Sequence, residues 1–263
     1  MTTPKRHSIK FIIVLLLGLT IVLTMPGCSS SFSESKIKEL YDHPEDFKGK
    51  TVKNLTMQIV AIDNVKGEVH LQAFENFVKA EHPTVVVLGD DKVKYEEGEY
   101  IKVSGKILGK VAVVDEEGVE MDAMKLKAKK IKKIKSTDAI PAEDTLDIGY
   151  DVKEKGVSAS IEKIDFTSDD TRVYIKVKNG TKKTIEIFPE QSLIVQDGND
   201  YMSDAENFIY EDVHLEKRVK AGETTSGVII FKRIDQNLPF TFTLEGGDSN
   251  GNEFKLPFVF EMQ

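Results

Sequence analysis

Apolar and polar residues alternate one by one in many short segments after residue 50, and this two-residue period constrains the fold more than any other feature. The side chains of a β-strand point alternately to its two faces, so such segments predict strands. In "TVKNLTMQIVAID" (residues 51–63) the alternation slips once near Asn54, which predicts a β-bulge. We therefore expect a mainly all-β fold class.

The first group of strands follows one helical segment. Ile37, Leu40 and Tyr41 are spaced i, i+3, i+4 and give one apolar helix face, which Pro44 ends. Five strand-like segments come next, and Gly105 interrupts the fourth, as expected where a barrel strand turns a corner. Residues 36–135 are thus predicted to form a five-stranded OB-type barrel.

The second group of strands fills residues 148–263. Turn residues recur there roughly every 8–12 positions, which predicts an antiparallel, immunoglobulin-like β-sandwich. Asn179-Gly180 is expected to form a hairpin turn, because both residues tolerate positive φ. Residues 136–147 have no periodic pattern and contain a proline, so we interpret them as a linker.

The N-terminus has the pattern of a signal peptide. Lys5, Arg6 and Lys10 precede an uncharged run over residues 11–25. A spanning helix needs ~20 apolar residues, so this shorter run favours a signal-peptide helix over residues 1–27. An uncleaved membrane helix and a plain secreted protein are the alternatives.

Cys28, the only cysteine, follows this run directly in "MPGC". The tetrapeptide resembles the bacterial lipobox. The resemblance implies cleavage after Gly27, a diacylglyceryl or palmitate-type lipid on Cys28, and anchoring at the extracytoplasmic face of the cell membrane. Each buried methylene contributes ~0.8 kcal/mol, so two or more chains hold firmly. The serine-rich residues 28–35 suit a flexible tether.

Two further resemblances concern the fold. "YDHPEDFKGKTVKN" and "EEGEYIKVSGKILG" resemble the OB modules of many Gram-positive lipoproteins of unknown role, and the resemblance implies the barrel without an active site. The matching residues are Tyr41, Pro44, Phe47, Gly49, Lys50, Gly98, Ile101, Val103 and Gly105.

The C-terminal half resembles the telokin-like, immunoglobulin-like domain of bacterial lipoproteins. That family has no agreed activity, so the resemblance implies only the sandwich. The matching residues are Val173 to Asn179, Thr181, Ile194, Asp197, Tyr201, Gly222, Glu223, Thr224, Gly227, Ile229 and Phe231.

Composition argues against several functional classes. The net charge is −8, with 19 Lys against 19 acids in residues 28–136 and 14 basic against 25 acidic residues in 137–263, so a general nucleic-acid binder is not expected. A single cysteine excludes an internal disulfide and a multi-cysteine metal site, and the five histidines lack metal-ligand spacing. No nucleophile motif occurs, so we expect no metal, no cofactor, no catalytic residue and no enzyme.

The possible ligand-binding residues lie in the barrel. Phe74, Tyr95 and Tyr100, with Phe77, are expected either to form a stacking surface or to pack in the core. A ligand would then bind this face and the loops around Gly67 and Gly109.

The run "KLKAKKIKKIK" has seven Lys in eleven residues, among them Lys125, Lys127 and Lys129. It is interpreted as a solvated or protected strand edge, as a phosphate-binding stripe, or as a contact for anionic lipid or wall polymer. "DSNGNE" (248–253) and "QDGNDYMSD" (196–204) resemble cation loops only superficially and favour hairpin turns.

The leading functional hypothesis is a membrane-anchored, extracytoplasmic, non-enzymatic binding or spacing protein. Its partners would be the bilayer, through diacylglyceryl-Cys28, and an unknown protein or cell-wall component. The alternative is a carbohydrate or anionic wall-polymer binding protein that uses the barrel face and residues 125–135. A third hypothesis is an accessory subunit that docks a partner by strand addition.

Overall fold

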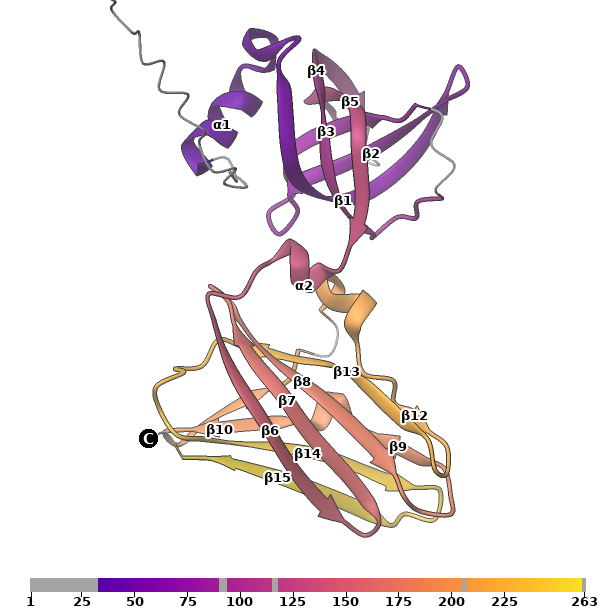
Figure 1. The fold of residues 1–263 in the computed structure, drawn as a ribbon, viewed down its shortest axis with the longest axis vertical. Helices are drawn as coiled ribbons and strands as arrows, with labels where there is room; N and C mark the ends of the chain where they lie inside the picture. Colours follow the sequence, from indigo (N-terminus) through magenta and orange to yellow (C-terminus); the bar gives the residue numbers. More distant parts are fainter. Residues whose placement is uncertain (1–32, 90–93, 115–117, 205–206, 262–263) are drawn as a thin grey trace, which may run out of the picture. The chain divides into compact units, whose positions relative to one another are not determined.

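Most of the described chain is β-strand (Figure 1). The computed structural model describes residues 33–89, 94–114, 118–204 and 207–261. The helical segments are α1 (Glu34–Asp42), η1 (Pro44–Phe47), α2 (Ser136–Ala139), η2 (Pro189–Gln191) and η3 (Phe208–Val213).

The strands fall into two groups along the chain. The first group is β1 (Thr51–Val65), β2 (Glu68–Asn76), β3 (Glu81–Val87), β4 (Tyr100–Val114) and β5 (Glu120–Ile134). The second group is β6 (Asp144–Glu154), β7 (Val157–Phe166), β8 (Asp170–Asn179), β9 (Ile185–Ile187), β10 (Leu193–Gln196), β11 (Asn199–Met202), β12 (Arg218–Val219), β13 (Thr224–Lys232), β14 (Phe240–Asp248) and β15 (Glu253–Phe260).

The predicted first helix is confirmed as α1. Leu40 is 1% exposed and packs in the barrel core. The Tyr41 hydroxyl lies 2.8 Å from Thr84 Oγ1, and its ring stacks on His82 with the ring centroids 4.5 Å apart. Pro44 follows the end of the helix and opens η1. The apolar face read from the sequence therefore fastens α1 to the barrel.

The five strands β1 to β5 form a closed barrel in the order β1-β2-β3-β5-β4, which confirms the predicted five-stranded barrel. Neighbouring strands are antiparallel except β3 and β5, which run parallel. Inward side chains alternate with outward ones, as the sequence period predicted. The buried core residues of the strands are Val52, Leu55, Met57, Ile59, Leu71, Ala73, Val86, Ile101, Val103, Ile107, Met124 and Leu126.

Bulges and glycines shape the barrel wall. The predicted slip near Asn54 is confirmed, because the β1–β4 register shifts there and Asn54 has a φ of 56°. A Cβ on Gly105 would lie 2.3 Å from the carbonyl oxygen of Lys127, so only glycine lets β4 and β5 approach so closely. Gly109, expected in a loop, lies inside β4 at a second register shift with a φ of 111°. That expectation was wrong because β4 continues to Val114.

The second group of strands forms two antiparallel sheets. One sheet has the order β13-β8-β7-β6, and the other has the order β11-β10-β14-β9-β12 with β15 paired to β14. Both sheets contribute to one apolar cluster, so they pack face to face as a sandwich. Phe231 of the first sheet and Phe242 of the second meet edge to face with their ring centroids 5.8 Å apart. Residues 31–263, which include the barrel, form one compact unit.

Two connections differ from the sequence expectation. The predicted linker, residues 136–147, contains α2 and the first residues of β6. Asn179-Gly180 is not a hairpin turn, because β8 pairs with β7 and β13 while the next strand, β9, belongs to the other sheet. The Asn179 side chain is buried and donates to the carbonyl oxygens of Lys183 and Val219 at 2.7 and 2.9 Å. Its side-chain amide therefore stabilises the segment in which the chain passes from one sheet to the other.

A buried arginine ties three segments together next to α2. Arg172 in β8 is fully buried, and its guanidinium donates to the carbonyl oxygen of Ile140 and to the Tyr210 hydroxyl, both at 2.7 Å. The Tyr210 hydroxyl donates in turn to Asp170 at 2.6 Å. Burial raises the pKa of Asp170, although the hydrogen bond from Tyr210 and the charge of Arg172 oppose that rise.

The close approach at Gly105 leads to a prediction about stability. Gly105→Ala should lower the free energy of unfolding by about 1–3 kcal/mol, because the new methyl group must push against the Lys127 backbone. Chemical denaturation measures the change. Gly89→Ala is the matched control, since a Cβ there meets nothing within 4 Å. Equal stability of the two variants would contradict the prediction.

Candidate functional site

An apolar cleft lies on the barrel where β3 and β5 separate. The two strands pair only from Thr84 opposite Met124 to Val87 opposite Lys127. Before this point β3 is irregular, since His82 has a φ of 61° and Pro83 has no N–H to donate to a neighbouring strand. In the described part of the chain, residues 120–123 of β5 consequently pair with β4 alone.

The cleft has a volume of about 250 Å³, and none of its lining residues is ionisable. Val60 and Val114 at its border are 42% and 59% exposed, so the cleft opens to the solvent over an apolar rim. The cleft can therefore bind a ligand through apolar contact and backbone hydrogen bonds. The lining residues are Val60, Ala61, Gln72, Ala73, Phe74, Pro83, Thr84, Val85, Val113, Val114, Met121 and Ala123.

The lining residues come from two hairpins and the strand between them. β1 and β2 form one hairpin, whose turn residues Lys66 and Gly67 have φ values of 54° and 86°, the left-handed conformation that a tight hairpin needs. β4 and β5 form the other hairpin. The expected binding loop around Gly67 thus belongs to the hairpin that contributes Val60 and Ala61.

The predicted aromatic residues do not form one surface. Phe74 is half-buried and lines the cleft. Tyr95 is half-buried against the barrel core, with the ammonium of Lys133 5.4 Å from its ring centroid. Tyr100 is 4% exposed and meets Phe77 edge to face with the ring centroids 4.9 Å apart.

Tyr100 is covered by the chain around η3. Its hydroxyl donates to the carbonyl oxygen of Ile209 at 2.9 Å. Burial raises the pKa of Tyr100, and the nearby carboxylate of Asp212 raises it further. The phenol therefore stays protonated as a hydrogen-bond donor and is not free to stack on a ligand.

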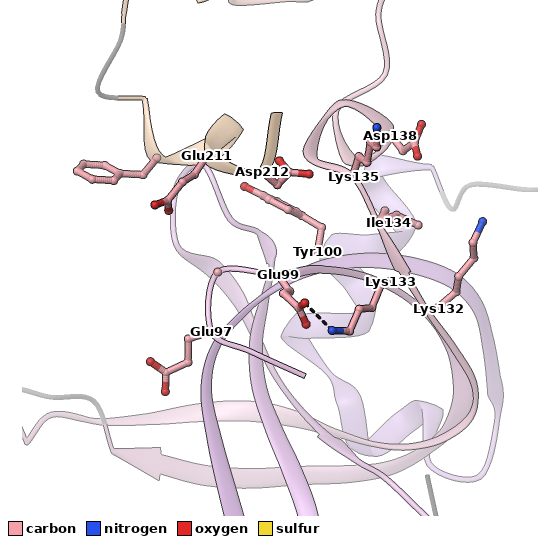
Figure 2. A pocket seen from close by; sticks show the side chains of 12 residues that line it. Glu97, Glu99, Tyr100, Lys132, Lys133, Ile134, Lys135, Asp138, Glu211 and Asp212 are labelled. Carbon is pink, nitrogen blue, oxygen red and sulfur yellow. Dashed lines mark hydrogen bonds and ion pairs between the residues drawn. The ribbon is translucent and has the colours of Figure 1, made fainter. Parts of the chain in front are cut away.

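Beside Tyr100 lies a second hollow with mixed charges, shown in Figure 2, with a volume of about 550 Å³. Lys133 forms an ion pair with Glu99 at 2.5 Å, and the Ser136 N–H donates to the Asp212 carboxylate at 3.1 Å. Three of its eight charged lining residues are thus engaged in contacts within the protein. The charged residues that line it are Glu97, Glu99, Lys132, Lys133, Lys135, Asp138, Glu211 and Asp212.

The predicted lysine run lies on β5, where Lys125 is half-buried while Lys127 and Lys129 are exposed. Lys129 is the extra residue of the bulge opposite Ser104 and Gly105. The register also brings Lys102 and Lys106 of β4 directly opposite Lys132 and Lys127, and the sequence analysis missed these two. Aligning the sequences of β4 and β5 as an antiparallel pair would have placed these two lysines next to the lysine run. We call the following set the basic face: Lys102, Lys106, Lys127, Lys130 and Lys132.

The two sequences that superficially resemble cation loops are hairpin turns. The carboxylate of Asp248 accepts hydrogen bonds from the Asn252 side chain and from the backbone N–H groups of Asn252 and Asn250, which lower its pKa to about 2. Asp197 and Gly198 join β10 to β11 with φ values of 49° and 74°. Within the described ranges no group of three His, Cys, Asp or Glu could hold a metal ion.

The anchor residues predicted from the sequence, Gly27 and Cys28, lie outside the described residues. In the part of the chain that is described, no helix combines the length and the apolar character needed to cross a membrane.

No protein family and no curated protein matches the sequence. A protein of unknown function from Listeria monocytogenes EGD-e has 13% identity and a TM-score of 0.37, over 49% of this chain and 94% of that one. The Bacillus subtilis protein ycdA, described as a lipoprotein, has 13% identity and a TM-score of 0.32, over 41% of this chain and 38% of that one. The archaellum periplasmic stator protein FlaG from Sulfolobus acidocaldarius has 13% identity and a TM-score of 0.24, over 43% and 95%. Likenesses at these scores support no inference about activity.

The buried phenol of Tyr100 should make the free energy of unfolding fall as the pH rises into the alkaline range. The unfolded chain loses this proton near pH 10, whereas the folded protein keeps it because its pKa is raised. The contribution is therefore fully present below about pH 10 and is lost as the pH rises further. Tyr100→Phe should flatten the alkaline fall in unfolding free energy by up to about 1.4 kcal/mol per pH unit.

At neutral pH the same variant should lose about 1 kcal/mol, since the hydrogen bond to Ile209 disappears. Denaturant titrations at a series of pH values measure both effects. Tyr150→Phe, at a ring that is 42% exposed, controls for the substitution itself. Parallel alkaline curves for the wild type and Tyr100→Phe would refute the assignment.

Proposed function

We propose that this chain is a lipid-anchored, extracytoplasmic binding protein without enzymatic activity, in which the barrel is the binding module. The observation that carries the proposal is the apolar cleft, whose lining residues provide no ionisable group. General acid–base and metal-assisted chemistry need such groups next to the reacting atoms, whereas binding does not. A ligand held there would be positioned and released unchanged.

Anchoring is argued from the N-terminal sequence. The positive residues, the short apolar run and "MPGC" occur in the order that lipoprotein processing requires. We infer that cleavage after Gly27 leaves Cys28 as an acylated N-terminus on the outer face of the membrane. The barrel module, whose first element α1 begins at Glu34, would follow a short tether from Cys28, and the sandwich, whose first strand β6 begins at Asp144, would follow α2.

The ligand of the cleft is argued from its chemistry. An apolar surface with one aromatic ring, Phe74, suits an extended peptide with apolar side chains or the apolar face of a sugar ring. Beside the cleft, residues 120–123 of β5 pair with β4 on one side and with no described strand on the other. An extended peptide could add to this open edge through backbone hydrogen bonds, which favours a peptide ligand over a sugar. We therefore propose a protein partner first and a carbohydrate partner second.

Binding of an anionic wall polymer is the second candidate function. The observation that favours it is the basic face, whose lysines point outward from β4 and β5. This face is distinct from the apolar cleft, so the two proposals can be tested by separate substitutions.

If the protein is anchored through Cys28, replacing this cysteine should move the protein out of the membrane fraction. The wild-type protein should be labelled by a palmitate analogue in cells and should partition with membranes. Cys28→Ser should take up no label and should leave the processed membrane fraction, because no thiol remains to carry the lipid. Unlabelled wild-type protein, or a labelled Cys28→Ser variant, would refute the anchor.

Ligand binding in the cleft can be followed with a single-thiol reporter. After Cys28→Ser the chain has no cysteine, so Val114→Cys places one environment-sensitive dye at the cleft border. A panel of short extended peptides and oligosaccharides should include ligands that shift its emission. Phe74→Ala should weaken the binding of those ligands about tenfold or more, since burying a phenylalanine ring contributes roughly 1.5–3 kcal/mol.

The matched control is Phe208→Ala, at an 82% exposed ring that lines the other hollow. It should leave the reporter response unchanged. Equal losses in both variants would show that the response does not come from the cleft, and no response to any compound would remove the binding function.

A further inference from the structure

The outward side of β1, β4 and β5 is lined by lysines and small polar residues. Lys102 lies between Thr56 of β1 and Lys132 of β5 in one row of paired residues. Another row is formed by Thr51, Lys106 and Lys127. Since paired residues point to the same side of a sheet, each row presents its side chains together on the surface. The lysines are exposed except Lys102, which is half-buried.

In the part of the chain that the structure describes, the lysines of the basic face are close to no acidic partner. Within the described ranges, no ion pair involves any of these five residues, whereas Lys48, Lys110 and Lys133 of the same barrel do form ion pairs. Like charges that lie directly opposite one another destabilise a sheet by some tenths of a kcal/mol per pair. The two Lys–Lys pairs therefore oppose folding, and an anionic partner would relieve their repulsion.

We propose that the basic face docks on anionic phospholipid headgroups of the membrane that carries the protein. The inference rests on the anchoring proposed above. Lysine side chains near an anionic bilayer each contribute about 1 kcal/mol of attraction, which acts within about a Debye length of the surface. The hydroxyl groups of Thr51 and Thr56 in the same rows can donate hydrogen bonds to headgroup phosphates.

The length of the tether favours a lipid surface over a distant polymer. Six residue steps separate Cys28 from Glu34, where α1 begins. An extended chain covers at most about 3.6 Å per residue, so the start of α1 lies within roughly 22 Å of the acylated cysteine. Leu40 then fastens α1 to the barrel core. The barrel is thus confined next to the bilayer, where its lysines meet a high local density of phosphate.

The charge of the rest of the chain fits the same orientation. Residues 137–263 contain 14 basic and 25 acidic residues, so an anionic membrane repels this part. Attraction of the basic face and repulsion of the acidic sandwich together favour a bound state with the barrel against the lipid.

Vesicle sedimentation tests the proposal without the lipid anchor. The processed chain from residue 28 with Cys28→Ser keeps the whole compact unit of residues 31–263. At low salt it should bind vesicles of about one-third phosphatidylglycerol in phosphatidylcholine and should not bind pure phosphatidylcholine. The variant K102Q/K106Q/K127Q/K132Q should bind at least about 30-fold more weakly, and roughly 0.5 M salt should abolish wild-type binding.

The matched control is K153Q/K176Q/K178Q/K232Q, which removes the same charge from exposed sandwich lysines. It should bind like the wild type. The basic-face variant should be at least as stable as the wild type to denaturant, because it loses two like-charge pairs, so weaker binding cannot be ascribed to unfolding.

Three outcomes would overturn the inference: equal binding of the basic-face variant and the wild type, equal binding to both vesicle types, or binding to a soluble glycerol-phosphate polymer with none to vesicles. The last would assign the face to a wall polymer. Palmitate labelling of the wild type separates this result from the anchor itself. Labelling without vesicle binding removes only the docking, and vesicle binding without labelling removes only the anchor.

Discussion

The close approach of β4 and β5 at Gly105 is the constraint on which the barrel depends. The two strands form a long antiparallel ribbon, and the missing side chain at Gly105 leaves space for the Lys127 carbonyl. Register shifts at Gly105 and before Gly109 bend this ribbon, so that it pairs with β1 on one side and with β3 on the other. The same bends set the side chains of Val103, Ile107 and Leu126 inward and leave the lysines outward.

The functional surfaces follow from where this ribbon stops pairing. β5 leaves β3 before Met124, because Pro83 and the left-handed His82 prevent β3 from continuing alongside it. The apolar cleft occupies the resulting separation. The basic face lies on the ribbon farther along, where β4 pairs with both β1 and β5. One strand pair therefore supports an apolar site and a cationic site that do not share residues.

Local patterns in the sequence predicted the local features correctly. The spacing of Ile37, Leu40 and Tyr41, the slip at Asn54 and the glycine at position 105 all have the predicted structural role. These features depend on neighbours in sequence or on sterics at one residue. The five-stranded barrel and the antiparallel sheets could be predicted because alternation of apolar and polar residues records which face of each strand is buried.

Features that depend on long-range pairing could not be predicted in this way. Asn179 was expected in a hairpin turn, yet its side chain donates to the carbonyl of Val219, 40 residues along the chain, as well as to that of Lys183, and no local rule indicates the distant contact. Tyr100 is unavailable for stacking because η3 covers it, and the carbonyl oxygen of Ile209 accepts a hydrogen bond from its phenol. The sequence revealed only the part of the basic face that lies in the lysine run of β5. Lys102 and Lys106 lie outside that run and come opposite Lys132 and Lys127 only through strand register.

The hydrogen bonds of Arg172 have a mechanical consequence. The buried guanidinium holds the buried phenol of Tyr210 and the carbonyl of Ile140, which directly follows α2. Buried bonds of this kind yield only when both partners give up their contacts together, since a lone charge left there would be unsolvated. Tension applied to the sandwich would therefore be transmitted through Ile140 to the chain segment that leaves the barrel, with little extension of the connection itself.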